Sequence, residues 1–186
     1  MAEVHAVKEP ETIQLVSHLL KIRHSQQMAD VWDLGLNLAL RISDLLSITF
    51  RDIDGDRLVL RESKTGKLAT IHLNPKAQKI IQRIRDEHPH HLYLFQSYRN
   101  QQSRHRTPRP ITRRAVGKAF ELVGEELKIA LGTHSMRKTR GYHLYQATND
   151  IARVMQMLRH RSAGVTLRYI GVTQDEIDRD FRELVL

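Results

Sequence analysis

The chain of 186 residues contains no cysteine, which excludes disulfide bonds, thiolate zinc sites and thiol catalysis. No apolar run approaches the roughly 20 residues that span a bilayer, and the polar N-terminus does not form a secretory signal. Aromatic residues make up only 5% of the chain, and no Gly/Ser-rich or Pro-rich linker divides it. The sequence therefore predicts a single globular domain.

The motifs of several enzyme classes are also missing. Residues 63–67 (SKTGK) lack the upstream glycine of a phosphate-binding loop, and there is no Gly-x-Ser-x-Gly or His-Glu-x-x-His motif. No acidic cluster is suited to magnesium, and the neighbouring His88, His90 and His91 lack a supporting carboxylate pattern. We expect neither a metal site nor a cofactor.

Positive charge is the first feature that indicates a partner. Lysine and arginine together number 30 against 21 aspartates and glutamates, so the formal net charge is +9. A compact basic domain suits a polyanion such as nucleic acid, although a basic protein without that role has a similar composition.

Hydrophobic periodicity predicts a mainly α-helical domain with a small antiparallel β-sheet, an α+β class. Alternation over 57–63 and 67–73 predicts a β-hairpin, with Lys64-Thr65-Gly66 as its turn. Ser43 is a good N-cap for a short helix over 44–48. Residues 92–95 fit a short strand or a buried loop. Another helix is predicted to begin at Pro10. The remaining predicted helices cover 26–40, 75–87, 112–129, 135–147, 150–158 and 173–186.

The segment 99–114 carries six arginines and no acidic residue. It fits a loop that contacts the DNA backbone and a disordered basic loop equally well. Arg113 and Arg114 are the stronger candidates, because a helix N-terminus also favours phosphate. The predicted DNA-binding residues are basic side chains of this segment and elsewhere: Lys67, Arg106, Arg113, Arg114 and Arg159.

Six side chains form a metal-free set suited to attack on a phosphodiester: Arg41, Lys64, His134, Arg137, His160 and Tyr169. Guanidinium groups bind phosphate oxygens bidentately and neutralise the charge of the transition state. A lysine can protonate a departing 5′ oxygen, and a tyrosine becomes a nucleophile when a histidine accepts its proton. The phosphotyrosyl product keeps the energy of the phosphodiester, so a second hydroxyl can reseal the strand without ATP.

Each member of the set also has an ordinary structural explanation. A tyrosine near a C-terminus usually packs, and Arg41 could form a surface ion pair with Asp44 three residues later. Lys64 resembles any exposed lysine of a turn, and Lys67 competes with it because a shifted hairpin register would exchange the two. The ordered conjunction of the six residues favours the chemical interpretation.

With these residues the sequence resembles the catalytic domain of the tyrosine recombinases, the family of phage integrases and Xer-type recombinases. The resemblance covers nearly the whole chain and rests on Arg41 in Arg-Ile-Ser-Asp, Lys64 in the hairpin, His134-x-x-Arg137, Leu158-x-His160 and Thr166-x-x-Tyr169. It implies that Arg41 and Arg137 clamp the scissile phosphate and that Lys64 is the general acid.

The resemblance also implies that His134 assists as a base, that His160 donates to a phosphate oxygen and that Tyr169 attacks to leave a 3′-phosphotyrosine. Three positions depart from the family pattern: Ala39 and Arg159 replace glycines, and Asp44 replaces a glutamate. No reacting group is lost, so we expect an active enzyme.

The resemblance further implies a domain arrangement. Family members usually carry an N-terminal helical domain of roughly 100 residues, whereas here the resemblance begins almost at once. We expect a single catalytic domain over 1–186 without that core-binding domain, as a fragment or as a minimal recombinase like the fimbrial phase-switching invertases. Residues 1–9 are expected to be flexible. The helix over 173–186 is expected to pack in cis or on a neighbouring protomer.

The expected partners are double-stranded DNA, further copies of the chain in a tetramer on DNA, and accessory DNA-bending proteins, with no membrane. The expected location is the cytoplasm, at the nucleoid. Two rival functions stay open. One is a non-catalytic DNA-binding regulator in which 41–50 is part of a helix-turn-helix. The other is a type IB topoisomerase, which uses the same chemistry without paired sites.

Overall fold

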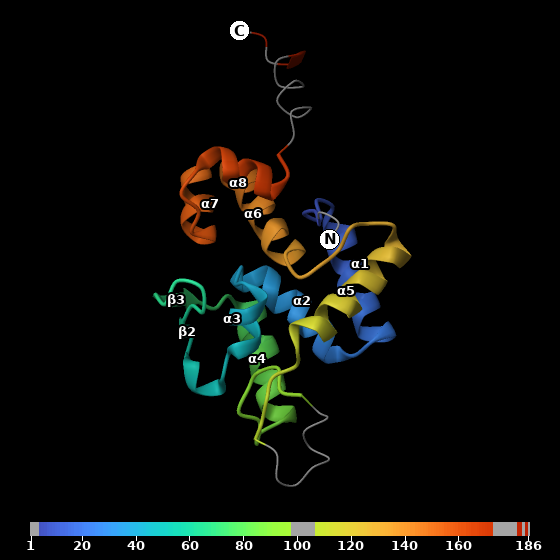
Figure 1. Cartoon of the computed structure of the whole chain (residues 1–186), viewed down its shortest axis with the longest axis vertical. Helices are drawn as coiled ribbons and strands as arrows, with labels where there is room; N and C mark the ends of the chain where they lie inside the picture. The colour runs from blue at the N-terminus through green and yellow to red at the C-terminus, as the bar shows by residue number, and fades with distance from the viewer. Residues whose placement is uncertain (1–3, 98–106, 173–181, 184, 186) are drawn as a thin grey trace.

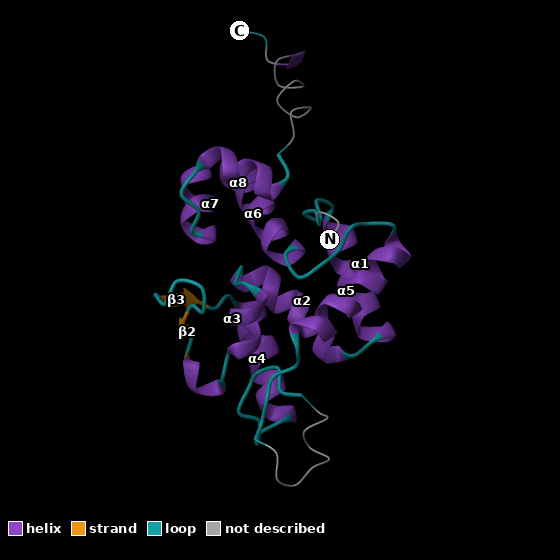
Figure 2. Ribbon diagram, in the orientation of Figure 1, coloured by secondary structure: helices purple, strands orange, loops and turns teal. Residues whose placement is uncertain are grey.

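The computed structural model describes residues 4–97, 107–172, 182–183 and 185, which form a mainly helical protein with one small sheet (Figures 1 and 2). The helices are α1 (Pro10–Arg23), α2 (Gln26–Leu38), α3 (Ile42–Ser47), α4 (Pro75–Glu87), α5 (Arg113–Leu127), α6 (Ser135–Thr148), α7 (Ile151–Leu158) and α8 (Ala163–Ile170). The predicted fold class is confirmed.

Helix α2 forms the centre of the core and buries nine of its 13 residues. Trp32, the only tryptophan of the chain, is fully buried in it. Its indole Nε1–H donates to the carbonyl oxygen of Ile13 in α1 at 3.1 Å, and its ring meets Phe120 of α5 edge-on with 5.6 Å between centroids. A buried indole needs such an acceptor, so Trp32 joins three helices at one point.

Helix α2 ends two residues earlier than predicted, so Arg41 lies between α2 and α3. Ala39 has a φ of 53°, in the left-handed region that ends helices, and Arg41 is extended at the N-cap of α3. Ser43 therefore lies inside α3 and does not cap it, contrary to the prediction. Because the Arg41 side chain makes no capping hydrogen bond, its guanidinium group can reach other partners.

The predicted hairpin forms with shorter strands, and a third strand precedes it. A 3₁₀ turn at Phe50–Asp52 leads into β1 (Ile53–Asp54), which pairs with β2 (Arg57–Arg61), and β2 pairs with β3 (Leu68–His72). The register places Arg61 opposite Leu68. Residues 62–67 form the loop, in which Gly66 has a φ of 65°.

Helices α6, α7 and α8 pack against one another at one end of the protein (Figure 1). They share a small apolar cluster formed by Val154, Leu158 and Ile170, separate from the main core. Helix α8, which begins behind the N-cap Ser162, was not among the predicted helices. The helix predicted over 173–186 lies almost wholly outside the described residues.

The start of the described chain lies against α6. The backbone N–H of Val7 donates to Thr139 Oγ1 at 2.8 Å, and the carbonyl oxygen of Val7 lies 3.1 Å from His143 Nε2. Lys8 Nζ lies 4.8 Å from the centroid of the Tyr142 ring. Val7 is also buried in the main core, and this burial explains why the segment is held.

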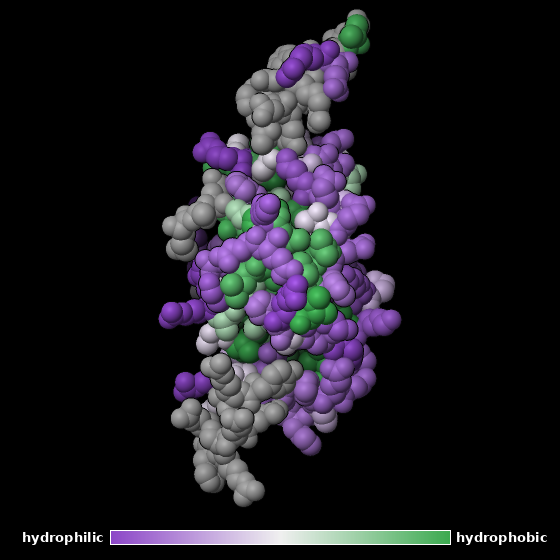
Figure 3. Space-filling view, turned by 90° about the vertical axis from the view of Figure 1, so that its right-hand side faces the viewer, coloured by the Kyte–Doolittle hydropathy of each residue, from purple (hydrophilic) through white to green (hydrophobic). Residues whose placement is uncertain are grey.

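Figure 3 views the side of the protein that carries α1 and α5 and shows hydrophilic side chains around a gathering of apolar ones. Among the large apolar side chains of these helices, Leu15, Ile22 and Leu122 are exposed. Within the part of the chain that the structure describes, no helix combines the length and apolar composition needed to cross a membrane.

Candidate active site

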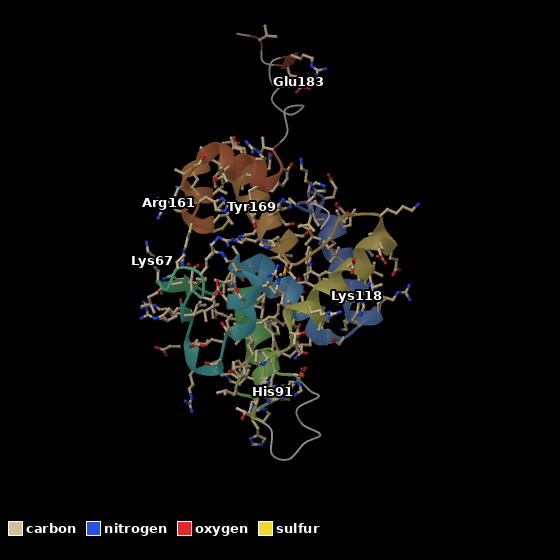
Figure 4. All side chains as sticks on the ribbon, in the orientation of Figure 1. Lys67, His91, Lys118, Arg161, Tyr169 and Glu183 are labelled. Atoms are coloured by element: carbon tan, nitrogen blue, oxygen red, sulfur yellow. The ribbon has the colours of Figure 1, made fainter. Side chains whose placement is uncertain are left out.

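Tyr169 of α8 lies at the boundary between the α6–α8 group and the rest of the protein (Figure 4). Its hydroxyl oxygen is 3.4 Å from His134 Nδ1, and its ring meets the ring of His160 edge-on with 4.9 Å between centroids. Lys138 Nζ lies over the face of the same ring, 5.2 Å from its centroid. One phenol is thus surrounded by an imidazole, a second imidazole and an ammonium group.

Helix α6 supplies three of the surrounding side chains through its periodicity. His134 is its N-cap residue, and Arg137 and Lys138 follow three and four residues later, on the same face. Arg137 is buried, and its Nη2 donates to the carbonyl oxygen of Leu158 at the end of α7. Arg137 Nε has no hydrogen-bond partner among the described residues, so this buried guanidinium group retains unused donor capacity.

Arg41 reaches the site from the α2–α3 junction and meets a buried carboxylate. Glu62, only 4% exposed, holds its Oε1 3.5 Å from Arg41 Nη1. Its Oε2 forms an ion pair with Arg159 Nη1 and accepts a hydrogen bond from Thr65 Oγ1 at 2.8 Å. Burial raises the pKa of Glu62, but the hydrogen bonds from Thr65 and Arg159 and the two arginine charges outweigh it and hold the pKa below its usual value.

The two predicted phosphate-binding arginines act on the same phenol. Burial raises the pKa of Tyr169 above its usual value, while the positive charges of Arg137 and Arg41 oppose that rise. The pKa of Arg137 itself is lowered mainly by burial, and the charges of Tyr169, Arg41, Glu62 and Arg159 also act on it. The guanidinium groups therefore share one site, and the tyrosine is protonated in the free protein.

Both histidines of the site have lowered pKa values. Partial burial and the charge of Arg113, followed by the charges of Arg137, Lys138 and Arg41, lower the pKa of His134. Burial and the charges of Arg137 and Arg41 lower the pKa of His160. Both imidazoles are therefore neutral near pH 7, and a neutral His134 Nδ1 can accept a proton from the Tyr169 hydroxyl.

The hydrogen bonds of Thr166 fix which nitrogen of His160 carries the proton. Thr166 Oγ1 donates its single hydrogen to the carbonyl oxygen of Ser162 at 2.7 Å, and it lies 3.2 Å from His160 Nδ1. Thr166 must therefore accept from Nδ1–H, which leaves Nε2 as an acceptor in the neutral ring. His160 can donate to a phosphate oxygen through Nε2 only when the ring is protonated.

The structure brings five of the six predicted catalytic residues together and leaves Lys64 apart. Lys64 and its competitor Lys67 both lie exposed on the 62–67 loop. No contact within the described residues joins either ammonium group to Tyr169. Figure 4 shows Lys67 on the hairpin, well away from Tyr169.

The predicted DNA-binding residues fall into different environments. Arg113 and Arg114 are exposed at the start of α5 and line, together with His134, a cleft of about 1490 Å³. Arg159 is engaged by Glu62, with its side chain 32% exposed. Arg106 lies outside the described residues.

Asp44 contacts the hairpin loop and not Arg41. Asp44 is fully buried, and its Oδ1 accepts hydrogen bonds from the backbone N–H of Ser63 at 2.9 Å and from Ser63 Oγ at 2.6 Å. The ordinary structural explanation of Arg41, a surface ion pair with Asp44, does not hold, because Arg41 contacts Glu62. Asp44 instead fastens α3 to the base of the hairpin loop.

Two residues of the site were missed, Glu62 and Lys138, and Thr166 was named in a motif without a role at the site. The alternation of β2 offered a signal for Glu62, since Leu58 and Leu60 are buried and Glu62 is the next inward position. Helical spacing offered one for Lys138, four residues after His134. Across the described ranges, no group of three or more potential metal-ligating side chains comes together.

Comparison with known proteins identifies related sequences. The model of the phage integrase family matches residues 7–176. The "Probable integrase/recombinase YoeC" of Bacillus subtilis is 35% identical over 177 residues, an alignment that covers 92% of this chain and 92% of that protein. Tyrosine recombinase XerC of Corynebacterium glutamicum is 28% identical over 149 residues, with 77% of this chain and 46% of XerC covered.

The fold has the same relatives. The crystal structure of XerA recombinase superposes with a TM-score of 0.73 at 14% identity, covering 98% of this chain and 65% of that one. A lambda integrase dimer bound to a core site gives a TM-score of 0.68 at 16% identity, covering 91% and 61%. Given the family match over most of its length and the identity to YoeC, the chain belongs to the phage integrase family of tyrosine recombinases.

Proposed function

We propose that this protein is a site-specific DNA recombinase that cleaves and rejoins strands through a covalent 3′-phosphotyrosine on Tyr169. The observation that carries the proposal is the placement of the Tyr169 hydroxyl 3.4 Å from a neutral His134, within the field of Arg137 and Arg41. A nucleophile, its base and two anion-binding groups thus share one site, as acid–base-assisted displacement at phosphorus requires.

In the proposed reaction the Tyr169 oxygen attacks the scissile phosphorus while its proton passes to His134. The bond from phosphorus to the 5′ oxygen breaks, and Lys64 gives that oxygen a proton. Arg41 and Arg137 bind the non-bridging oxygens, and they stabilise the charge that builds up on them. A 5′ hydroxyl of a second strand reverses these steps and releases Tyr169.

His160 fits the same scheme when a phosphate is present. Its pKa is lowered in the free protein by burial and by the charges of Arg137 and Arg41. An incoming phosphate offsets those charges and favours the protonated ring, whose Nε2–H can then donate to a phosphate oxygen. His160 is expected to gain its proton as DNA binds.

Double-stranded DNA is the proposed substrate. Similar folds have been solved on DNA, among them a lambda integrase dimer on a core site and XerH on its difH substrate. Arg113 and Arg114 are exposed at the N-terminus of α5 and line one cleft with His134, which supports the proposal that they contact the DNA backbone. A tetramer on paired sites, accessory DNA-bending proteins and a place at the nucleoid complete the proposal.

A nicked substrate that traps the cleaved strand tests the chemistry. Incubation with fragmented, nicked genomic DNA should give adducts that survive denaturing electrophoresis, and sequencing the attached ends should identify the site. Tyr169→Phe should abolish the adduct, whereas Tyr145→Phe, on α6, should retain it. Equal behaviour of wild type and Tyr169→Phe refutes the nucleophile assignment. Tight binding without an adduct would indicate a non-catalytic regulator, and relaxation of supercoils without paired sites would indicate a topoisomerase.

A further inference from the structure

Glu62 is a buried acidic residue to which the proposed reaction gives no task. Its side chain is 4% exposed and contacts both Arg41 and Arg159. A negative charge beside a phosphate-binding site opposes the binding of DNA, and a buried charge is stable only when it is well paired. A role other than DNA binding is needed to explain its position.

The backbone of Glu62 closes the loop that carries Lys64. The Glu62 N–H donates to the carbonyl oxygen of Lys67 at 2.9 Å, and the Gly66 N–H donates to the carbonyl oxygen of Glu62 at 2.9 Å. The Glu62 side chain accepts from Thr65 Oγ1 at 2.8 Å. The loop that carries Lys64 is therefore hydrogen-bonded to Glu62 through Thr65, Gly66 and Lys67.

Arg159 connects this loop to the end of α7 through its ion pair with Glu62. It is the C-cap of α7 and has a φ of 54°, a left-handed conformation that favours glycine. A side chain at this strained position is explained by its ion pair with Glu62. His160 is the next residue, and its ring packs on the ring of Tyr169. The ion pair therefore connects the Lys64 loop to the segment that carries His160.

We propose that Glu62 and Arg159 form a positioning pair that holds the hairpin loop against the α7–α8 turn, so that Lys64 can deliver its proton to the leaving oxygen. This inference rests on the proposed strand cleavage by Tyr169. Neither residue touches the reacting atoms in this scheme, and both act through the placement of Lys64. Glu62 also contacts Arg41, and we expect this contact to remain when Arg159 is replaced.

A leaving-group substitution separates this role from others. Replacing the bridging 5′ oxygen of the scissile phosphate by sulfur gives a thiol leaving group that departs as the thiolate without a proton donor, because its pKa is far lower than that of an alcohol. The Tyr169 oxygen still forms its bond to phosphorus, and the bond from phosphorus to sulfur breaks. A defect in proton delivery is rescued by the sulfur substrate, and a defect in phosphate binding or folding is not.

The experiment compares single-turnover adduct formation on oxygen and sulfur versions of the trapped site. Arg159→Gly suits it because glycine adopts the left-handed conformation without strain and leaves Glu62 paired with Arg41. On oxygen DNA we expect Arg159→Gly and Glu62→Gln to slow cleavage about 10- to 100-fold, the range expected when a proton donor is misplaced. On sulfur DNA, Arg159→Gly should return to within about threefold of wild type, and so should Lys64→Ala.

Two controls complete the comparison. Arg41→Ala should remain slow on both substrates, and Arg159→Lys should keep part of the rate on oxygen DNA because it keeps the charge. The double variant of Glu62→Gln with Arg159→Gly should be no slower than Glu62→Gln alone. A matching thermal midpoint for Arg159→Gly and wild type excludes a folding defect.

The proposal fails if Arg159→Gly cleaves oxygen DNA at the wild-type rate, or if its defect is equally large on sulfur DNA. It also fails if neither Lys64→Ala nor Lys67→Ala is rescued by sulfur, since the loop then supplies no acid. Failure of the underlying function looks different, because wild type then gives no Tyr169-dependent adduct on either substrate.

Discussion

The Tyr169 hydroxyl is held under opposing influences. Burial raises its pKa, and the charges of Arg137 and Arg41 lower it without cancelling the effect of burial. A phosphate bound to the same arginines further weakens their pull on the phenol. Ionisation of the tyrosine before attack is therefore disfavoured, and in the proposed reaction the phenol passes its proton to His134 during attack.

The pKa of His134 gives a direct measurement at this scale. After burial, the largest influence on it is the charge of Arg113. Arg113→Ala removes a positive charge and should raise the pKa of His134 toward the ordinary value of 6.5. A proton NMR titration of the imidazole in the free protein measures this shift. Arg114→Ala is the matched control and should leave the titration unchanged.

The same residue sets the expected pH dependence of cleavage. A base must be neutral, so activity is present above the pKa of His134 and is lost as the pH falls through it. Since that pKa is lowered by burial and by Arg113, the acid limb of the wild-type profile should lie below 6.5. The rate at low DNA concentration reports this value for the free protein. A limb centred above 6.5 would contradict the assignment of His134.

The sequence motifs predicted most of the candidate site residues. The contacts that join those residues could be seen only in the folded structure. His134 and Arg137 are predictable from helical spacing because both belong to one element. Glu62 and Arg159 come from a hairpin and a helix end far apart in sequence, and no local pattern pairs them. An inward position in an alternating strand could have marked Glu62 as buried, but its partners depend on how the elements pack.

At the scale of elements, α8 was the main omission. Residues 163–170 contain a glycine and the β-branched Val165, Thr166 and Ile170, which have modest helix propensity. Their helix is explained by packing, since Thr166 and Ile170 are fully buried. By contrast, α4 was predicted accurately because Asn74 and Pro75 are strong local start signals.

Close packing of α6 on α7 and α8 predicts a sharp response to one added methyl group. A Cβ at Gly141 would lie 2.7 Å from Ile170 Cγ2 and 3.1 Å from Leu158 Cδ1. Gly141→Ala should therefore destabilise this group by about 1–3 kcal/mol and reduce adduct formation, because α8 carries Tyr169. Thermal unfolding and the adduct assay measure the two effects.

Gly117→Ala is the matched control in α5. The nearest side-chain atom to a Cβ there is 4.0 Å away, so alanine should be neutral or should stabilise the helix by up to about 1 kcal/mol. Equal stability of the two variants would contradict the close contact between α6 and α8.

For the whole molecule, the formal charge of +9 predicts that the affinity for DNA depends strongly on salt concentration. The logarithm of the binding constant should fall linearly with the logarithm of salt concentration, by about 0.9 for each phosphate neutralised. Arg114→Ala should reduce that slope by about 0.9 if Arg114 contacts one phosphate. Lys76→Ala, which removes a lysine paired with Asp33, should not change it. Fluorescence anisotropy over a salt series measures both slopes.

The single tryptophan sits where α1, α2 and α5 meet, whereas Tyr142, Tyr145 and Tyr169 belong to α6 and α8. Indole emission thus reports on one region and phenol emission mainly on another. Selective excitation of the indole during denaturation reports the loss of the core but does not report the detachment of α6–α8. Comparing it with excitation of both fluorophores offers a label-free way to learn whether the nucleophile's helices detach before the remainder melts.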